Sequence, residues 1–342
     1  MIRYPSTVGD IESRDFDSAK VVGGPLVASG GMCEASVSLY RKSPGNADLL
    51  ESRHEVHVAV VDQDGRLVAS AGDPARLTVL HSVAKPWQAR VCLGGSSSID
   101  ERLLAIICGS HCGADAHASQ ILRGLSTGGL QPDALAVGLG YVGADRFRHQ
   151  CSGNHMGFLL ACVNNQWPVA GYERLAHPSQ VAAHEAVASA AGFSPSQVPV
   201  TMDGCGVAAF ALPLRTIASM YALLKRSDPD QYSAMLKHPD LVSGVGQRDF
   251  RIMQAVTSCV AKFGSEAVEA ICLPDQNLGI AVRIEDGQER ALGPATVAVL
   301  RQCLTGLDLS SLADLEEPTT QLRGREEEVV TVLRPDVTLR FE

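Results

Sequence analysis

The chain has 342 residues, of which 45% are hydrophobic and 20% are charged. This balance is typical of a globular protein with a substantial core, built as one large domain or as two interlocked lobes. The net charge of −9 argues against a basic surface for nucleic acid. No apolar run is long enough for a spanning helix, and no secretory signal begins the chain. We therefore expect a cytoplasmic protein without nucleic-acid or membrane partners, whose ten cysteines are reduced thiols.

The order of the predicted elements indicates an α+β fold. Residues 1–30 are rich in Gly and Ser and indicate an irregular N-terminal extension. The β-branched segments 54–62 and 66–71 flank a Gln-Asp-Gly turn and predict a β-hairpin. Five alanine-rich or amphipathic stretches then predict helices at about 115–125, 155–165, 179–190, 214–225 and 249–263.

Strand patterns return toward the C-terminus, at 267–273, 278–285, 328–333 and 337–341. Between them, Pro294 suits the first position of a helix over about 295–304. Strands at both ends with helices between predict one antiparallel sheet formed by both termini, with a helical region inserted. We expect residues 31–342 to form a single domain of two interlocked lobes.

Three short motifs occur in the order found in serine acyl-transfer enzymes: S-x-x-K at 82–85, S-x-N at 152–154 and K-x-G at 262–264. At helical spacing, Ser82 and Lys85 lie on one face, where a neutral lysine can take the serine proton. The alternative is a serine that only caps a helix, with the lysine in solvent. Lys262 followed by Gly264 is equally a helix C-cap.

Other turn-like segments carry groups suited to chemistry. Ser110 and His111 follow an apolar run, and Ser152 and Asn154 offer a hydroxyl and an amide to a substrate. Each pair is also explained as a capping turn. Asp203, in a tight Gly-flanked turn, suits a substrate ammonium, although Asp-Gly is a routine turn dipeptide.

The cysteines Cys151 and Cys205 lie beside these turns and could share a metal. Two thiols without clear third and fourth ligands fall short of a recognisable zinc site.

Several longer segments together resemble the asparaginase II family, the Rhizobium etli-type L-asparaginases. The resemblance covers roughly residues 33–342, and the segments keep the family's order and approximate separations. They are 51–54 (ESRH), 82–86 (SVAKP), 108–111 (CGSH), 151–155 (CSGNH), 202–205 (MDGC), 237–239 (KHP), 244–246 (GVG) and 278–287 (LGIAVRIEDG).

The resemblance implies a fold like that of serine β-lactamases and glutaminases, and homodimers that hydrolyse L-asparagine to L-aspartate and ammonia. It implies two Ser–Lys pairs, Ser82 with Lys85 and Ser110 with Lys262. It also implies substrate contacts from Asp203, His81, His111, Ser152 and Asn154, and a possible zinc site at Cys151 and Cys205. No cofactor is required, and the partner is a small amide.

Two residues depart from the family pattern. Asn154 stands where the family usually has lysine, which removes one implied zinc ligand and restores the S-x-N form of glutaminases. His81 stands where an arginine commonly precedes the serine, so a permanent charge becomes a titratable one. The alternatives are therefore a glutaminase or other small-amide hydrolase, a β-lactamase-like hydrolase, or a non-catalytic homologue that binds an amino acid.

Overall fold

The computed structural model describes residues 35–43, 45–93, 99–140, 145–322 and 325–342. The expected irregular extension, residues 1–30, lies outside these ranges. Contacts within the chain divide it after Gly31, and Met32–Glu342 form one compact unit.

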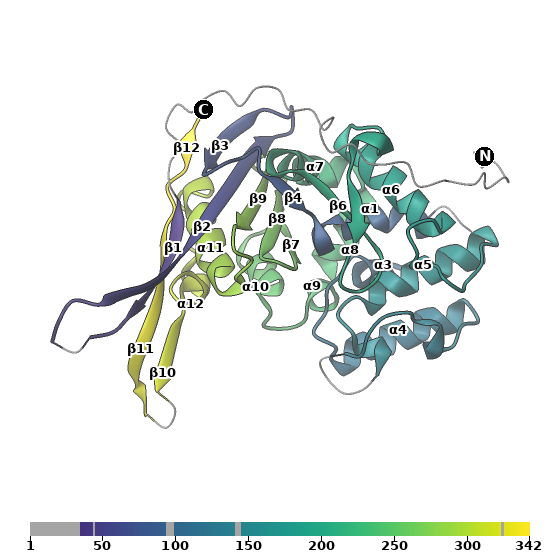
Figure 1. Ribbon diagram of the computed structural model, residues 1–342, viewed down its shortest axis with the longest axis horizontal. Coiled ribbons are helices and arrows are strands. Elements are labelled where there is room, and N and C mark those ends of the chain that lie inside the picture. The colour runs from purple at the N-terminus through teal and green to yellow at the C-terminus, as the bar shows by residue number, and fades with distance from the viewer. Residues whose placement is uncertain (1–34, 44, 94–98, 141–144, 323–324) are drawn as a thin grey trace. The chain divides into compact units, whose positions relative to one another are not determined.

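In the described part of the chain, nine strands form one antiparallel sheet, with the order β10-β11-β1-β2-β9-β8-β7 and with β3 pairing with both β2 and β12 (Figure 1). The strands are β1 (Ser36–Arg41), β2 (Leu49–Asp62), β3 (Leu67–Ala71), β7 (Val260–Gly264), β8 (Val268–Leu273), β9 (Leu278–Ile284), β10 (Thr319–Leu322), β11 (Arg325–Asp336) and β12 (Arg340–Phe341). The sheet is built from both ends of the sequence, which confirms the predicted α+β class. The predicted hairpin is also confirmed, because β2 and β3 pair around the turn at 63–65.

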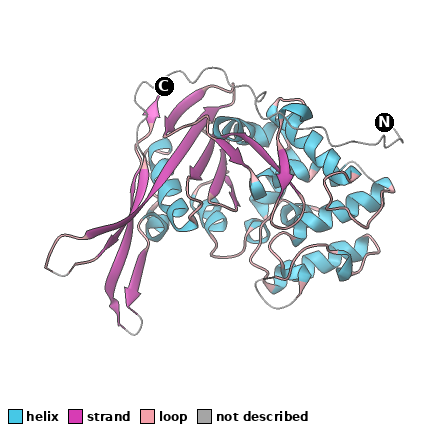
Figure 2. Cartoon of the chain, viewed as in Figure 1, coloured by secondary structure: helices cyan, strands magenta, loops and turns pink. Residues whose placement is uncertain are grey.

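Most of the helices are formed by the segment between β3 and β7. They are α1 (Lys85–Gln88), α2 (Arg90–Leu93), α3 (Glu101–Ile107), α4 (Asp115–Thr127), α5 (Ser152–Asn165), α6 (Pro178–Ala191), α7 (Leu214–Ser227), α8 (Pro229–Lys237), α9 (Pro239–Val242), α10 (Arg248–Ala255), α11 (Leu292–Cys303) and α12 (Ala313–Glu316). Short 3₁₀ segments are η2 (His81–Ala84), η3 (Pro132–Ala134), η4 (Arg146–Arg148), η5 (Pro195–Gln197), η6 (Glu289–Ala291) and η7 (Ser310–Leu312). Figure 2 shows most of these helices gathered beside the sheet.

Helices α7 and α11 pack on the sheet, while α3, α4 and α5 pack on one another. Strand β8 is buried along its whole length, as a strand covered on both faces should be. Within the described ranges, no helix combines the length and apolarity needed to cross a bilayer.

One predicted helix is wrong in its second half. The stretch 249–263 splits into α10, which ends at Ala255, and β7, which begins at Val260. Ser258 has φ = 60° and breaks the helix between them. Val256 and Val260 flank this break, and β-branched residues favour strands. Helix α11 also begins earlier than predicted, at Leu292, so Pro294 is its third residue.

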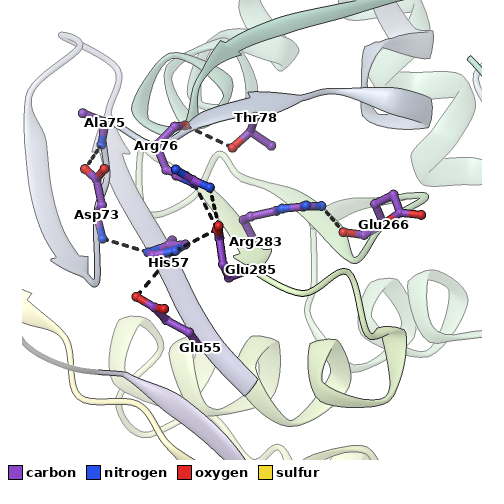
Figure 3. A network of polar contacts seen from close by, with 9 residues as sticks. All are labelled: Glu55, His57, Asp73, Ala75, Arg76, Thr78, Glu266, Arg283 and Glu285. Carbon is purple, nitrogen blue, oxygen red and sulfur yellow. Dashed lines mark hydrogen bonds and ion pairs between the residues drawn. The ribbon is translucent and has the colours of Figure 1, made fainter. Parts of the chain in front are cut away.

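A polar network joins His57 of β2 to Glu285, the residue just after β9 (Figure 3). His57 Nδ1 accepts from the Asp73 backbone N–H at 3.0 Å, so its Nε2 carries the proton and donates to Glu285 Oε2 at 3.2 Å. Arg76 makes two further hydrogen bonds to the same carboxylate. This network connects the sheet to the loop before β4 and so fixes the chain that leads to Ser82.

A second sheet of three short strands, order β4-β6-β5, carries two candidate site residues. β4 (Leu77–Val79) and β5 (Val200–Met202) both run antiparallel to β6 (Ala208–Pro213). They are therefore parallel to each other, and their C-terminal ends lie on the same side of the sheet. The residues that follow them, Ser82 and Asp203, are brought to one place although they lie far apart in sequence.

Candidate active site

Ser82 and Lys85 lie at the join between η2 and α1, both nearly buried at 6% and 3% exposure. The Lys85 backbone N–H donates to the Ser82 carbonyl, which closes the helical turn between them. The segment is held firmly, because the Tyr221 hydroxyl donates to the Val83 carbonyl at 2.9 Å. His81, just before the serine, has φ = 45°, a strained conformation of the kind that clusters at functional sites.

The Lys85 ammonium joins this turn to the second serine segment. Its Nζ donates to the Gly109 carbonyl at 2.7 Å and to Ser110 Oγ at 2.9 Å. Lys85 therefore lies one turn from Ser82 in sequence but in direct contact with Ser110 in space. A base in contact with a hydroxyl can exchange a proton with it.

The Ser110 segment is held by backbone hydrogen bonds on both sides. Its N–H donates to the Val242 carbonyl at 2.7 Å, and the next N–H, that of His111, donates to the Gln150 carbonyl at 3.2 Å. The preceding residue must be glycine, because a Cβ atom on Gly109 would lie 2.7 Å from the same Val242 oxygen. The sequence predicted a sharp turn presenting Ser110, and the close packing of Gly109 shows how that turn is fixed.

Lys262 is completely buried on β7 rather than at a helix end. Its Nζ donates to the Phe263 carbonyl at 2.6 Å and lies 3.9 Å from Asp249 Oδ2. Burial is the main cause that lowers the pKa of Lys262 to about 8; Asp249 opposes the shift, and the charge of Lys85 contributes to it. No hydrogen bond joins Lys262 to Ser110 among the described residues, so the lysine in contact with Ser110 is Lys85.

Strand β7 nevertheless lies directly against the Ser82 turn. A Cβ atom on Gly264 would lie 2.9 Å from the Leu80 carbonyl and 3.4 Å from His81 Cβ. Lys262 and Gly264 point to the same face of β7, because side chains alternate along a strand. The K-x-G motif is therefore close to the S-x-x-K motif in space, as the sequence pattern predicts.

His111 supports the site through Ser152. Its Nδ1 accepts from the Gly113 N–H, so Nε2 carries the proton and donates to Ser152 Oγ at 3.1 Å. The Ser152 hydroxyl in turn donates to the Phe147 carbonyl at 2.9 Å. His111 also stacks on His117, with ring centroids 4.8 Å apart. Burial holds the pKa of His111 well below its ordinary value, so this histidine is neutral.

Asp203 faces the residue before the first serine. Its Oδ1 lies 3.5 Å from His81 Nδ1, and this contact lacks the geometry of a hydrogen bond, since that nitrogen has no partner among the described residues. The same carboxylate oxygen accepts from the Gly204 N–H at 2.6 Å. Asp203 therefore keeps capacity to accept from a ligand.

Cys151 and Cys205 are neighbours, as the sequence suggested. A hydrogen bond from the Cys205 thiol lowers the pKa of Cys151, and the Lys85 charge and His149 lower it further. The same contact and burial raise the pKa of Cys205. Cys151 is therefore the more acidic thiol of the pair.

These residues do not fit the zinc site that the resemblance implies. Zinc in proteins is held by Cys, His, Asp or Glu, commonly four in number. Asn154 instead presents a neutral amide, whose Oδ1 is buried without a hydrogen-bond partner among the described residues. No group of three metal-binding side chains of those four types is found there either. We therefore assign no catalytic step to a metal.

The unpartnered buried atoms near the cysteines include donors and acceptors. His155 Nδ1 lies 2.6 Å from the Tyr172 hydroxyl, which already accepts from the Ala136 N–H and so donates to this nitrogen. His155 Nε2 then carries a proton and has no partner in the described structure. Asn154 and His81 each also have a buried polar atom without a partner in the described structure, and such atoms are normally satisfied by water or a ligand. From the sequence, His155 was only the last residue of the 151–155 segment and had no assigned role, because its hydrogen bond depends on Tyr172 from another segment.

A cavity of about 320 Å³ opens beside Ser110. It is lined by Ser110, His111, Cys112, Gln150, Ser243, Gln247, Arg248, Asp249, Phe263 and Glu289. Of the ten lining residues, the sequence singled out only Ser110 and His111 as site residues. The cavity therefore lies against Ser110, the residue whose hydroxyl Lys85 contacts.

The comparison with protein families decides what kind of chain this is. The model of a family described as L-asparaginase II matches residues 45–335, most of the sequence. The chain belongs to the L-asparaginase II family. Membership supports an amide-hydrolysing enzyme, with the motifs above in its expected active site. A comparison with curated proteins gives no match.

Solved structures similar to this L-asparaginase II family member are distant. They include a β-lactamase from Mycobacterium bovis, 17% identical with a TM-score of 0.36, covering 72% of this chain and 94% of that one. A candidate β-lactamase from Bacteroides dorei DSM 17855 is 12% identical with a TM-score of 0.33, covering 81% and 93%. Simvastatin synthase from Aspergillus terreus is 12% identical with a TM-score of 0.26, covering 74% and 88%. At such identities and scores we draw no conclusion from these structures.

Proposed function

We propose that the protein hydrolyses L-asparagine to L-aspartate and ammonia through a covalent acyl-enzyme. One observation carries the proposal: the Lys85 ammonium lies one helical turn from Ser82 and hydrogen-bonds Ser110 Oγ at 2.9 Å. This arrangement puts a candidate nucleophile and a candidate base one helical turn apart, with a second hydroxyl in contact with the base. It is the minimum needed to activate a serine and to return its proton to a leaving amine.

In the first step, the Ser82 oxygen attacks the side-chain amide carbon while neutral Lys85 accepts the serine proton. The carbon–nitrogen bond then breaks, and the proton returns through Ser110 to the departing ammonia. Ser82 is the second residue of η2, where a backbone N–H lacks a helical acceptor and can stabilise the oxyanion. Water, deprotonated by the same Lys85–Ser110 path, attacks the ester and releases the acid.

The substrate's amino-acid end is proposed to bind the free polar groups beside this site. Asp203 accepts from the α-ammonium, with His81 beside it at 3.5 Å. The buried Asn154 oxygen, which has no partner in the described structure, offers a further acceptor. His111 and Ser152, the other predicted substrate contacts, hydrogen-bond to each other at 3.1 Å.

A coupled ammonia assay with L-asparagine, D-asparagine, L-glutamine and small peptides, with and without zinc, tests the proposal. Ser82→Ala and Lys85→Ala should each lower kcat by at least about a hundredfold, the usual effect of losing a nucleophile or a base. Ser126→Ala, an exposed serine on α4, serves as the matched control. Full activity in either site variant would refute the assignment.

A second substrate is favoured by Asn154. Because a neutral acceptor replaces the lysine common in the family, a longer amide such as L-glutamine could be accommodated. A higher kcat/KM for L-glutamine than for L-asparagine would establish this alternative. Turnover of nitrocefin would instead indicate a β-lactamase-like hydrolase, and saturable amino-acid binding without ammonia release would indicate a sensor.

We also propose that the enzyme works as a homodimer in the cytoplasm. Sedimentation velocity of the purified chain should give a single species of twice the monomer mass. A monomer at micromolar concentration would exclude the dimer.

A further inference from the structure

Arg248 is a charged residue of the cavity beside Ser110 that the mechanism above does not use. It is the first residue of α10, and its side chain is 18% exposed. The guanidinium stacks over the Phe263 ring, with its central carbon 4.8 Å from the ring centroid. Stacking fixes the plane of the guanidinium and leaves its edges free for hydrogen bonds.

One edge of the Arg248 guanidinium already makes a hydrogen bond within the protein. Arg248 Nε donates to Glu269 Oε2 at 2.8 Å, and Glu269 is fully buried on β8. Over the described ranges, no acceptor is found for the two terminal nitrogens of Arg248. Burial also raises the pKa of Glu269, so this carboxyl is a weak counter-charge for the guanidinium. The cavity is therefore lined by a positively charged guanidinium, whose terminal N–H groups have no acceptor in the described structure.

The other charged groups of the cavity are placed differently. Asp249 Oδ2 already accepts from the Phe263 N–H at 3.0 Å and lies 3.9 Å from Lys262 Nζ. Glu289 is exposed to solvent. The cavity thus offers an anion a fixed, partly buried donor, and its buried carboxylate is already engaged within the protein. A carboxylate matches the guanidinium edge in shape and charge.

We propose that this cavity is a carboxylate-binding site in which Arg248 holds the carboxylate of the amide substrate or of its acid product. The inference rests on the proposed function for the identity of the ligand. It makes Arg248 a specificity residue: the enzyme selects amides that carry a carboxylate. Gln150 and Gln247, which line the same cavity, supply neutral hydrogen-bonding groups beside it.

Direct binding tests the site independently of turnover. Isothermal titration calorimetry with succinate compares the wild type with Arg248→Gln/Glu269→Gln, which removes the guanidinium without leaving a buried charge unpaired. Arg251→Gln is the matched control, because this arginine lies on the same helix but pairs with Asp314 and does not line the cavity. Succinate affinity should fall at least about tenfold in the double variant, the loss of one charge-assisted hydrogen bond, and remain unchanged in the control. Equal affinity in all three proteins would overturn the inference.

Kinetics then separate this site from the proposed function. KM for L-asparagine should rise about 10- to 100-fold in the double variant, while kcat/KM for 3-aminopropanamide, which is asparagine without its carboxylate, should not change. An equal effect on both amides would overturn the specificity role. If the wild type hydrolyses neither amide but succinate binding still depends on Arg248, the function is wrong and the binding site stands. Should the double variant fail to fold, Arg248→Lys, which keeps the charge but loses the planar fork, must show the same selective rise in KM.

Discussion

The close approach of Gly109 to helix α9 gives a sharp test of how the active-site serine is held. A Cβ atom at position 109 would lie 2.7 Å from the Val242 carbonyl oxygen and 2.9 Å from that of Leu241. Both contacts are with backbone, and both residues are fully buried, so no side chain can rotate away. Gly109→Ala therefore forces two backbone segments apart, and overpacking of this kind costs about 1–3 kcal/mol.

The same displacement should reach the chemistry. Lys85 Nζ donates to the Gly109 carbonyl at 2.7 Å, and the adjacent Ser110 N–H donates to Val242 at 2.7 Å. Moving this backbone shifts both acceptors of the lysine at once. A misplacement of about 1 Å can cost about a hundredfold in rate, so kcat for amide hydrolysis should fall about 10- to 100-fold.

Urea unfolding followed by tryptophan fluorescence and the ammonia assay measure the two effects on one preparation. Gly138→Ala is the control, because its new Cβ would meet only the His149 ring, at 3.8 Å, an ordinary contact. That variant should match the wild type in both measurements. If Gly109→Ala behaves as Gly138→Ala does, close packing is not what positions Ser110.

Three further predictions concern ionisable groups of the site. Burial lowers the pKa of Lys262 to about 8, so if neutral Lys262 assists proton transfer, kcat rises with pH through about 8. Lys262→Arg, which stays charged, should lose that rise, and a retained rise in its pH–rate profile would exclude the role. Burial also lowers the pKa of His111 and of His117 below their ordinary 6.5. The unfolded chain therefore binds more protons below about pH 6.5, and the free energy of unfolding falls on acidification. In urea titrations at pH 7.5 and 5, the free energy of unfolding of His111→Gln should fall by less than that of the wild type. An equal fall in both proteins contradicts this. Asp203→Asn should raise KM for L-asparagine about 10- to 100-fold but not for succinamate, which has no amino group, and an equal rise for both would rule out Asp203 as the ammonium anchor.

Sequence patterns predicted an element correctly where interactions between residues close in sequence determine its structure. The hairpin of β2 and β3 follows from β-branched strands around an Asp-Gly turn, and the structure pairs Val58 with Ala71 as such a hairpin requires. Helix α4 begins at Asp115, where its prediction began. In these segments one face is apolar at the period of the element, so tertiary contacts reinforce the local preference.

The position of Lys262 could not be read in the same way. The stretch that contains it begins as a helix and ends as a strand, and a periodicity window that spans the break averages the two. What decides the outcome is pairing: Lys262 lies opposite Ala270 in β8, the next strand along the chain, and the helical pattern read over 249–263 does not take that strand into account. Its altered pKa follows from that burial, so neither its chemistry nor its neighbours were available from the motif alone.

The contact between Lys85 and Ser110 illustrates a more general limit. The motif placed Lys85 beside Ser82 because both lie on one turn, and the structure keeps that proximity. The direction of the ammonium is set elsewhere, by the Gly109 carbonyl and Ser110 hydroxyl, whose segment is fixed by hydrogen bonds to residues 150 and 242. A motif can therefore indicate which groups react. Which group each of them hydrogen-bonds depends on how separate segments pack together. This is why Ser110 contacts Lys85 in the structure, while its expected catalytic pairing with Lys262 stays a prediction. It is also why Arg248, which no motif marked, is found in the same cavity as Ser110.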